Sequence, residues 1–292
     1  MRQPMVPILI LIVLAALSCQ ERESTSQGPA EGTVSSADGL GIHYRTRGSG
    51  EPALVFVHGW SCDGSYWTAQ WDHFTANHQV VTIDLGGHGQ SGLGRGRWSM
   101  VAFGADVRAV VEKLDLDDVV LIGHSMGGAI IVEATLGMPG RVRGLVGVDN
   151  FQTPYLDMTP QQIEDFVSRM QVNFVTNTED WVRSMFPPGA DPLMVDKVAK
   201  DMASAPPEVA TSALRELLIW YSTQAPAALE KLRVPLQCIS SDKHPTDVEG
   251  ISAIVDRYEL RLMPGHGHFL MLEDPATFNS LLEDALDCLA TK

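Results

Sequence analysis

The sequence has few basic residues and few cysteines, and each shortage excludes classes of protein. Of its 292 residues, 21 are Lys or Arg and 36 are Asp or Glu, so the formal net charge is −15. Because binding to phosphates needs a basic surface, this charge argues against a nucleic acid as partner. Of the 4 cysteines, the three beyond Cys19 are an odd number and are too widely spaced for a disulfide framework or a cysteine-based metal site. Cys238 and Cys288 are expected to be buried, in a strand and in a terminal helix.

Motifs for cofactors are missing as well. The stretch Gly86-Gly87-His88-Gly89 does not fit the G-x-G-x-x-G frame of dinucleotide-binding proteins, and the sequence contains neither a P-loop nor a cluster of metal ligands. We therefore predict no metal ion and no cofactor. No protein partner is evident from the sequence. The remaining composition, 45% hydrophobic and 20% charged, is that of an ordinary globular protein.

The N-terminus has the features of an export signal. Residues 6–17 form an apolar run that is too short to span a bilayer comfortably, and residues 1–18 are predicted to be a signal peptide. The end of this segment, Ala16-Leu17-Ser18-Cys19, resembles a bacterial lipoprotein signal, in which the cysteine becomes lipidated. We expect an exported protein anchored to the periplasmic side of the outer membrane through Cys19, or otherwise a secreted one. Residues 19–33 are polar and are predicted to be a flexible tether.

Apolar runs alternate with helical patterns along the rest of the chain. Continuous apolar runs, rather than alternating ones, indicate strands buried on both faces, and hence a mostly parallel sheet. Alternation of such strands with helices predicts a doubly wound α/β fold. The predicted strands are residues 42–47, 53–58, 80–84, 119–123, 144–149, 234–240 and 258–263. The helical patterns outside residues 150–233 lie near 65–77, 99–114, 126–137, 248–257 and 275–290.

Residues 150–233 interrupt this alternation because they contain no strong strand signal. A structureless loop of that length is implausible, and helical patterns occur at 159–176, 179–185, 194–202 and 209–221. We therefore predict that residues 151–233 form an inserted helical cap between two parts of one core, residues 34–150 and 234–292. Methionines and aromatic residues are frequent in this segment; they favour either an adaptable apolar pocket or the inward faces of packed helices.

The most informative motif is Gly123-His124-Ser125-Met126-Gly127, which fits G-x-S-x-G. An apolar strand pattern precedes it and a helical pattern follows it. This context is typical of a sharp turn that exposes a nucleophilic serine. The alternative is a tight strand-to-helix turn without chemistry.

Three further motifs follow the same order as in the α/β-hydrolase fold family, which the chain resembles over about residues 34–290. They are His58-Gly59-Trp60, the loop Asp84-Leu85-Gly86-Gly87-His88-Gly89-Gln90-Ser91, and Gly267-His268-Phe269. The resemblance implies an eight-stranded, mostly parallel sheet. It also implies Ser125 as nucleophile, His268 as its base, and an oxyanion hole from the backbone N–H groups of Trp60 and Met126. His266 is the competing base. His58 is expected to support its turn, and His124 to serve in packing.

The acid that would pair with the base His268 is expected in an unusual place. The position that usually carries the acid in this family holds His244 here, and a histidine cannot supply the fixed negative charge that orients an imidazolium. Asp149 ends an apolar strand one strand earlier, where some family members carry their acid, and it is the preferred candidate. Asp247 and Asp242 remain alternatives, and Asp149 could instead be a capping residue at the entrance to the cap.

A serine at the turn excludes the dehalogenases and epoxide hydrolases of this family, which use an aspartate there. The chemistry that remains is acyl transfer to water. We expect hydrolysis of carboxylic esters with short-to-medium, fairly apolar substrates. Carbon–carbon bond hydrolysis, lactone hydrolysis and cofactor-free haloperoxidase-like activity stay open. So does a different class of protein, a non-catalytic ligand-binding scaffold.

Overall fold

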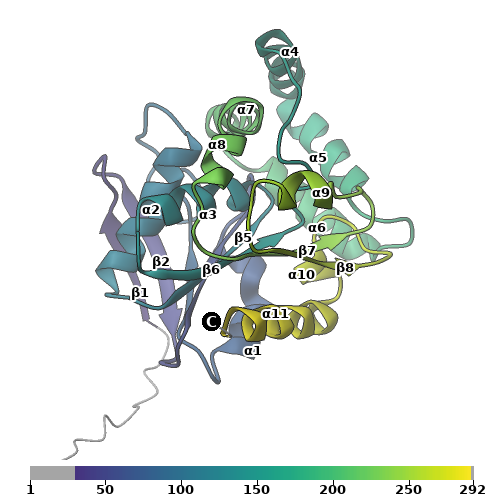
Figure 1. Ribbon diagram of the computed structural model, residues 1–292. Helices are drawn as coiled ribbons and strands as arrows, with labels where there is room; N and C mark the ends of the chain where they lie inside the picture. The colour runs from purple at the N-terminus through teal and green to yellow at the C-terminus, as the bar shows by residue number, and fades with distance from the viewer. Residues whose placement is uncertain (1–29, 291–292) are drawn as a thin grey trace, which may run out of the picture.

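The computed structural model describes residues 30–290, and an eight-stranded sheet forms its centre (Figure 1). The strand order is β1-β2-β4-β3-β5-β6-β7-β8. Strands β1 and β2 run antiparallel to their neighbours and the other six pair in parallel, which confirms the predicted fold class. The strands are β1 (Ala30–Ser35), β2 (Gly41–Arg47), β3 (Ala53–Val57), β4 (Val80–Ile83), β5 (Val119–His124), β6 (Val142–Val148), β7 (Leu236–Ser241) and β8 (Tyr258–Met263).

The central strands are buried on both faces, as their continuous apolar runs predict. Every residue of β3, β4, β5 and β7 is buried. Pairing aligns their carboxyl ends, since Val57, Gly123, Gly147 and Cys238 form one row across β3, β5, β6 and β7. The turns that follow these four strands therefore meet at one edge of the sheet.

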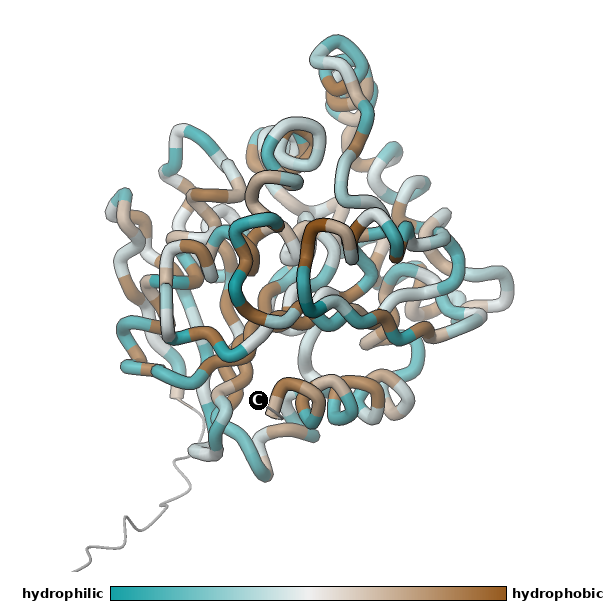
Figure 2. Tube along the Cα trace, in the orientation of Figure 1, coloured by the Kyte–Doolittle hydropathy of each residue, from teal (hydrophilic) through white to brown (hydrophobic). Residues whose placement is uncertain are grey.

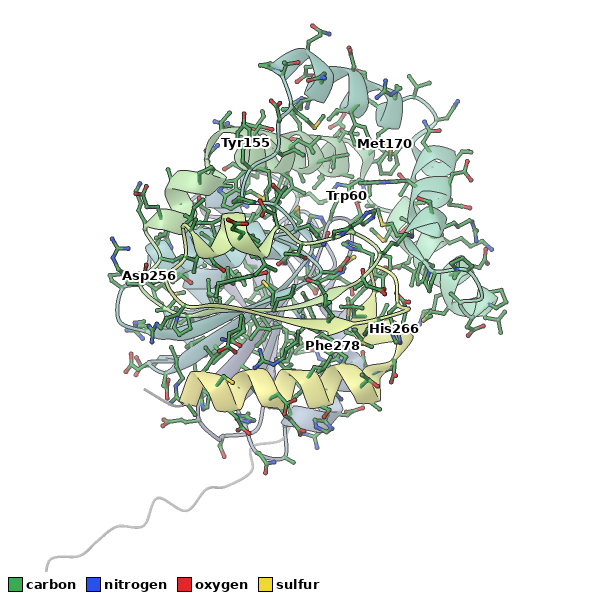
Figure 3. All side chains as sticks on the ribbon, turned by 45° about the vertical axis from the view of Figure 1, so that its right-hand side comes forward. Trp60, Tyr155, Met170, Asp256, His266 and Phe278 are labelled. Atoms are coloured by element: carbon green, nitrogen blue, oxygen red, sulfur yellow. The ribbon has the colours of Figure 1, made fainter. Side chains whose placement is uncertain are left out.

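Helices cover both faces of the sheet (Figure 1). Helices α1 (Thr68–Phe74) and α11 (Pro275–Ala290) pack together on one face, and α2 (Met100–Lys113), α3 (Met126–Leu136) and α8 (Ala225–Glu230) lie on the other. Figure 3 shows Phe278 between the sheet and α11, and Trp60 on the opposite side, toward the helices inserted after β6. Hydrophobic segments follow the central strands in Figure 2. The helices of the core are η1 (Gly64–Trp67), α1 (Thr68–Phe74), α2 (Met100–Lys113), α3 (Met126–Leu136), α9 (Val248–Ser252), α10 (Leu270–Glu273) and α11 (Pro275–Ala290).

The segment between β6 and β7 is helical, but it differs from the prediction in two ways: its first helix is broken, and a short helix before β7 was not predicted. The sequence predicts a single helix over residues 159–176, but the chain turns at Asn173, whose φ of 56° is left-handed. A left-handed residue cannot continue a right-handed helix, so a second helix begins at Phe174. The inserted helices are α4 (Pro160–Gln171), α5 (Phe174–Met185), α6 (Pro192–Ala203), α7 (Pro207–Thr223) and α8 (Ala225–Glu230).

The first strand lies where the sequence predicts a tether. Residues 30–33 fall inside the predicted tether 19–33, yet they belong to β1, in which Gly32 pairs with Tyr44 and Val34 with Ile42. The strand has little hydrophobic signal of its own because Val34 is its only large apolar residue. It forms through backbone hydrogen bonds to β2. The predicted signal peptide and the lipidation site at Cys19 lie outside the described residues.

The two cysteines that were expected to be buried differ in their exposure. Cys238 is buried in β7, as expected. The expectation that Cys288 is buried was wrong: this residue is exposed because it lies on the outward face of α11. Among residues 30–290 no helix combines the length and apolar character needed to cross a bilayer.

A buried carboxylate ties the start of the sheet to the loop after β4. The side chain of Asp106 is fully buried and accepts hydrogen bonds from Ser36 Oγ (2.6 Å) and from the backbone N–H of Gly86 (3.1 Å). Arg95 Nη1 donates to the same carboxylate at 2.9 Å, and Arg95 Nε donates to Asp38 at 2.7 Å. The side chain of Arg95 is only 3% exposed, so its charge depends on these partners.

Replacing Asp106 with Ala should therefore lower the free energy of unfolding by roughly 3–5 kcal/mol, because a buried guanidinium loses its main partner. Denaturant unfolding of Asp106→Ala measures this loss. The matched control is Asp118→Ala, which breaks the partly exposed pair with Arg143 (Nε to Oδ1, 2.8 Å) and should cost about 1 kcal/mol or less. Equal losses in the two variants would contradict the structural role given to Asp106.

Candidate active site

Ser125 occupies a strained turn between β5 and α3, as its motif predicts. The strand ends at His124, the helix begins at Met126, and Ser125 has φ 53° and ψ −116°. A left-handed φ is unfavourable for a non-glycine residue, and such strain persists only where the surroundings hold it in place. Here strand and helix nearly touch: a Cβ on Gly123 would lie 2.4 Å from the carbonyl oxygen of Gly127. The turn therefore requires glycine at position 123.

The turn after β3 lies directly beside Ser125. A Cβ on Gly59 would lie 3.2 Å from the Cβ of Ser125. His58 supports this turn as expected, since its Nδ1 donates to the carbonyl of Gly59 (2.8 Å) and its Nε2 accepts from the N–H of Leu85 (3.0 Å). The indole Nε1 of Trp60 donates to the carbonyl of Ala210 (2.7 Å), which joins the turn to α7.

The structure joins His268 to Asp149. His268 Nδ1 donates to Asp149 Oδ2 at 2.6 Å, and the other carboxylate oxygen accepts from the N–H of Ser241 at 2.9 Å. Asp149 is 3% exposed. Burial acts to raise the pKa of Asp149, but the hydrogen bond and charge of His268, with the Ser241 N–H, outweigh it and hold that pKa below its ordinary value. The side chain at position 149 is thus a carboxylate.

The competing residues have other partners. Asp247 accepts from the N–H of Gly250 (2.9 Å) at the start of α9, and Asp242 accepts from the N–H of Gly265 (2.9 Å). His266 donates through Nδ1 to the carbonyl of Pro264 (3.0 Å). Of the candidate acids and bases within the described chain, only Asp149 and His268 are hydrogen-bonded to each other.

Asn150 has a place in the site that the sequence did not reveal. Its side chain is buried, and Nδ2 donates to the carbonyl of Gly123 at 2.7 Å, directly before the turn. A Cβ on Gly128 would lie 2.3 Å from Asn150 Nδ2, and one on Gly147 would lie 2.3 Å from Asn150 Oδ1. The amide therefore fills the space that these two glycines leave open beneath the turn. Its only signal in the sequence is that it follows Asp149.

His124 does more than pack. Its Nε2 donates to the carbonyl of His268 at 2.9 Å, and the two rings lie 4.7 Å apart. Burial, followed by the charge of His268, lowers the pKa of His124 to about 3. His124 is therefore a neutral ring that anchors the backbone of His268.

Ser125, Asp149 and His268 share one pocket with side chains of the inserted helices. The cavity has a volume of about 600 Å³. Lys243 and His244, from the loop after β7, lie on its wall, and Lys243 Nζ donates to the carbonyls of Ser184 and Phe186. The inserted helices contribute mainly apolar residues: Phe166, Trp181, Met185, Leu214, Leu217, Leu218 and Tyr221.

The methionines and aromatic residues of the inserted segment divide between the two roles expected of them. Phe166, Trp181, Met185 and Tyr221 line this pocket, whereas Phe174 and Trp220 are buried in helix packing. Over residues 30–290, no group of three or more His, Cys, Asp or Glu side chains is arranged to hold a metal ion.

Comparison with known proteins identifies the family and the fold of the chain. The sequence model of the alpha/beta hydrolase family matches residues 54–281, so the chain belongs to that family. Among curated proteins, a non-heme chloroperoxidase from Streptomyces lividans is 38% identical over 115 residues, which are 38% of this chain and 41% of that protein. The matched region thus spans about two fifths of that relative.

Solved structures match over almost the whole described chain. A thermophilic esterase from Thermogutta terrifontis is 19% identical with a TM-score of 0.77, covering 90% of this chain and all (100%) of that one, and so shows the shared fold. A protein described as an N-acyl homoserine lactone degrading enzyme, Est816, is 25% identical with a TM-score of 0.74, covering 87% of this chain and 99% of that one.

A third histidine beside the site is also buried. His88 lies in the loop after β4, donates through Nδ1 to the carbonyl of Gly86 (3.0 Å), and has its ring 5.1 Å from that of His58. Burial, followed by the charge of His58, lowers the pKa of His88 to about 3. His88 is therefore neutral in the folded protein.

This histidine makes stability depend on pH. Because the pKa of His88 is lower in the folded than in the unfolded chain, the unfolded chain binds more protons, and the free energy of unfolding falls as pH drops below about 6.5. His88 alone should contribute a slope of about 1.4 kcal/mol per pH unit between about pH 6 and pH 4. Denaturant unfolding across this range should give a shallower slope, by that amount, for His88→Gln. Equal slopes would contradict a neutral His88.

Proposed function

We propose that this alpha/beta hydrolase is a serine hydrolase that cleaves carboxylic esters of short-to-medium, fairly apolar substrates. The observation that carries the proposal is the 2.6 Å hydrogen bond between His268 Nδ1 and Asp149, in the pocket that also contains Ser125. This bond keeps the ring proton on Nδ1. The lone pair on Nε2 is then available to accept the proton of the Ser125 hydroxyl.

The proposed reaction has two stages. Ser125 Oγ attacks the ester carbonyl while His268 Nε2 takes its proton, and Asp149 stabilises the imidazolium that forms. The backbone N–H groups of Trp60 and Met126 receive the negative charge on the carbonyl oxygen; Met126 is the first residue of α3, so its N–H has no partner within the helix. The imidazolium then protonates the departing alcohol. Water, deprotonated by His268, cleaves the acyl-enzyme and regenerates Ser125.

The size and lining of the pocket favour an apolar substrate. Its volume of about 600 Å³ lies in the range of small-molecule sites, and helices α4, α5 and α7 give it an apolar wall. Polar groups lie at the Ser125 end and along the loop that carries Lys243 and His244. An ester with its carbonyl at Ser125 and its apolar part toward the inserted helices matches this distribution.

Lactone hydrolysis is the second candidate. A lactone is a cyclic ester, and its opening uses the same nucleophile, base and oxyanion site. Similarity to Est816, the 25% identical protein described as an N-acyl homoserine lactone degrading enzyme, supports this candidate.

A fluorophosphonate probe that reacts with activated serines should label the folded protein, because His268 makes the hydroxyl of Ser125 nucleophilic. Ser125→Ala should abolish labelling and hydrolysis of p-nitrophenyl acetate together. Protein mass spectrometry measures the label. A folded protein that stays unlabelled would support a non-catalytic binding scaffold instead.

Asp149→Ala should lower kcat for p-nitrophenyl acetate by about 10⁴-fold, the effect of losing the orienting acid in such a triad. Asp149→Asn preserves the shape and tests charge separately; it should lose nearly as much activity. Asp242→Ala and Asp247→Ala are the matched controls and should retain activity, since neither side chain contacts His268. Activity retained by Asp149→Ala but lost in either control would show that the acid is elsewhere.

A further inference from the structure

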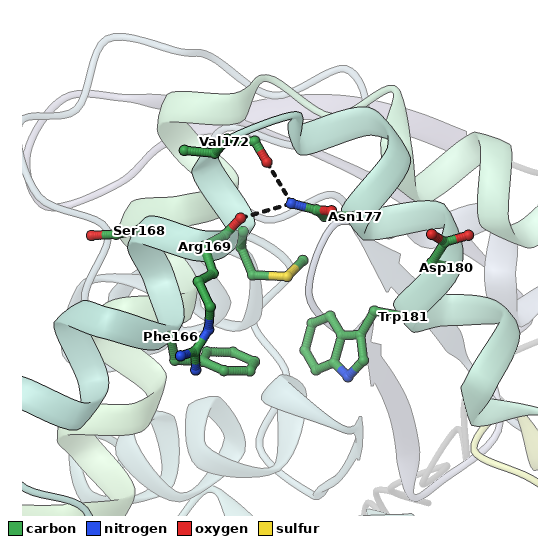
Figure 4. A pocket seen from close by; sticks show the side chains of 8 residues that line it. Phe166, Ser168, Arg169, Val172, Asn177, Asp180 and Trp181 are labelled. Carbon is green, nitrogen blue, oxygen red and sulfur yellow. Dashed lines mark hydrogen bonds between the residues drawn. The ribbon is translucent and has the colours of Figure 1, made fainter.

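A second apolar cavity adjoins the pocket at Ser125. It lies between helices α4 and α5 and has a volume of about 670 Å³; Figure 4 shows the side chains that line it. Its lining includes Phe166, Met170, Val172 and Trp181. Two of these residues, Phe166 and Trp181, also line the pocket at Ser125. We call this second cavity the outer groove.

The two shared residues form one aromatic contact. Phe166 comes from α4 and Trp181 from α5, and their rings meet edge to face with centroids 5.8 Å apart. This is a favourable geometry for an aromatic pair. Trp181 is also held from the other side, because its ring lies 5.3 Å from that of Trp60. The pair therefore stands between two apolar spaces and lines both of them, and we call it the partition.

The helices that carry this partition are fixed to each other. Asn177 Nδ2, in the first turn of α5, donates to the carbonyl of Arg169 at 2.7 Å and to that of Val172, across the turn at Asn173 (Figure 4). These bonds set the spacing of α4 and α5. The outer groove is thus a built feature of the inserted helices.

We propose that Phe166 and Trp181 are the specificity-determining residues that limit the length of the acyl chain, and that the outer groove would accept the chain if the partition were removed. This inference rests on the proposed ester hydrolysis. With the carbonyl at Ser125, an acyl chain directed toward the inserted helices ends against the aromatic pair. A longer chain must displace the pair or remain in water, so each further methylene gains no burial.

Opening the partition tests the proposal. Phe166→Ala removes the ring that does not contact Trp60, and Trp181→Leu is an independent variant that keeps an apolar side chain beside Trp60. The assay is kcat/KM for p-nitrophenyl esters from acetyl to dodecanoyl. Beyond the optimum of the unchanged protein, each added methylene should raise kcat/KM by about fourfold in both variants, until the groove is filled. Tyr155→Ala, which removes an exposed aromatic side chain outside both cavities, should leave the profile unchanged.

A second experiment fills the outer groove again. Val172 lines the outer groove but not the pocket at Ser125, so Val172→Trp introduced into Phe166→Ala should cancel the gain for long chains. Unchanged profiles in both Phe166→Ala and Trp181→Leu, with hydrolysis still dependent on Ser125, would overturn the inference. A gain seen for longer alcohol groups and not for longer acyl groups would also overturn it.

A binding measurement tests this inference independently of the proposed reaction. In the Ser125→Ala background, calorimetry measures the affinity for decanoate relative to hexanoate. Phe166→Ala should raise that ratio, by about fourfold for each methylene that enters the groove. A raised ratio supports the partition even if no ester is hydrolysed. An unchanged ratio contradicts the partition even if hydrolysis is confirmed.

Discussion

The parallel pairing of β3, β5, β6 and β7 is the constraint on which the site depends. Because these strands are aligned row by row, the turns at their carboxyl ends open at the same edge of the sheet. That edge is where ligands meet open α/β sheets. Ser125, Asp149 and Trp60 are far apart in the sequence, and each is positioned by the end of a different strand. The last strand, β8, leads to His268, which completes the group.

The same edge concentrates backbone strain. Ser61, Ser125, Asp149 and Phe151 all have positive φ, between 45° and 55°, and each follows a strand at this edge. Such conformations cost of order 1–3 kcal/mol each and persist only where packing determines them. Here the packing comes from contacts that leave no room for adjustment, such as Asn150 against Gly128 and Gly147. The buried sheet thus stabilises a site that would not hold this shape alone.

Much of the fold and of the site could be predicted from the sequence, for identifiable reasons. Buried parallel strands are continuously apolar, and Ser125, His268 and the turn at His58 lie in motifs whose glycines reflect close backbone contacts. Asp149 could be inferred because a carboxylate that ends an apolar strand needs a partner. Asn150 could not, since its role depends on space left by Gly128 and Gly147, and only the folded turns place that space around its side chain. Strand β1 and the break at Asn173 also escape prediction, because backbone pairing and one left-handed residue determine them.

The loop after β7 is not needed to supply the acid if that acid is Asp149, which follows β6. In the usual arrangement of this family, that loop must hold a carboxylate against the catalytic histidine, so its shape is tied to the chemistry. Here Lys243 binds the carbonyls of Ser184 and Phe186 at the end of α5, and His244 lies on the pocket wall. The loop joins the core to the inserted helices. Under the proposed mechanism, β7 and its loop therefore touch the proton-transfer pair only through the backbone N–H of Ser241, which binds Asp149 and does not depend on the side chain at that position. Selection for a new substrate could thus change side chains of this loop while the hydrogen bond to Asp149 is kept.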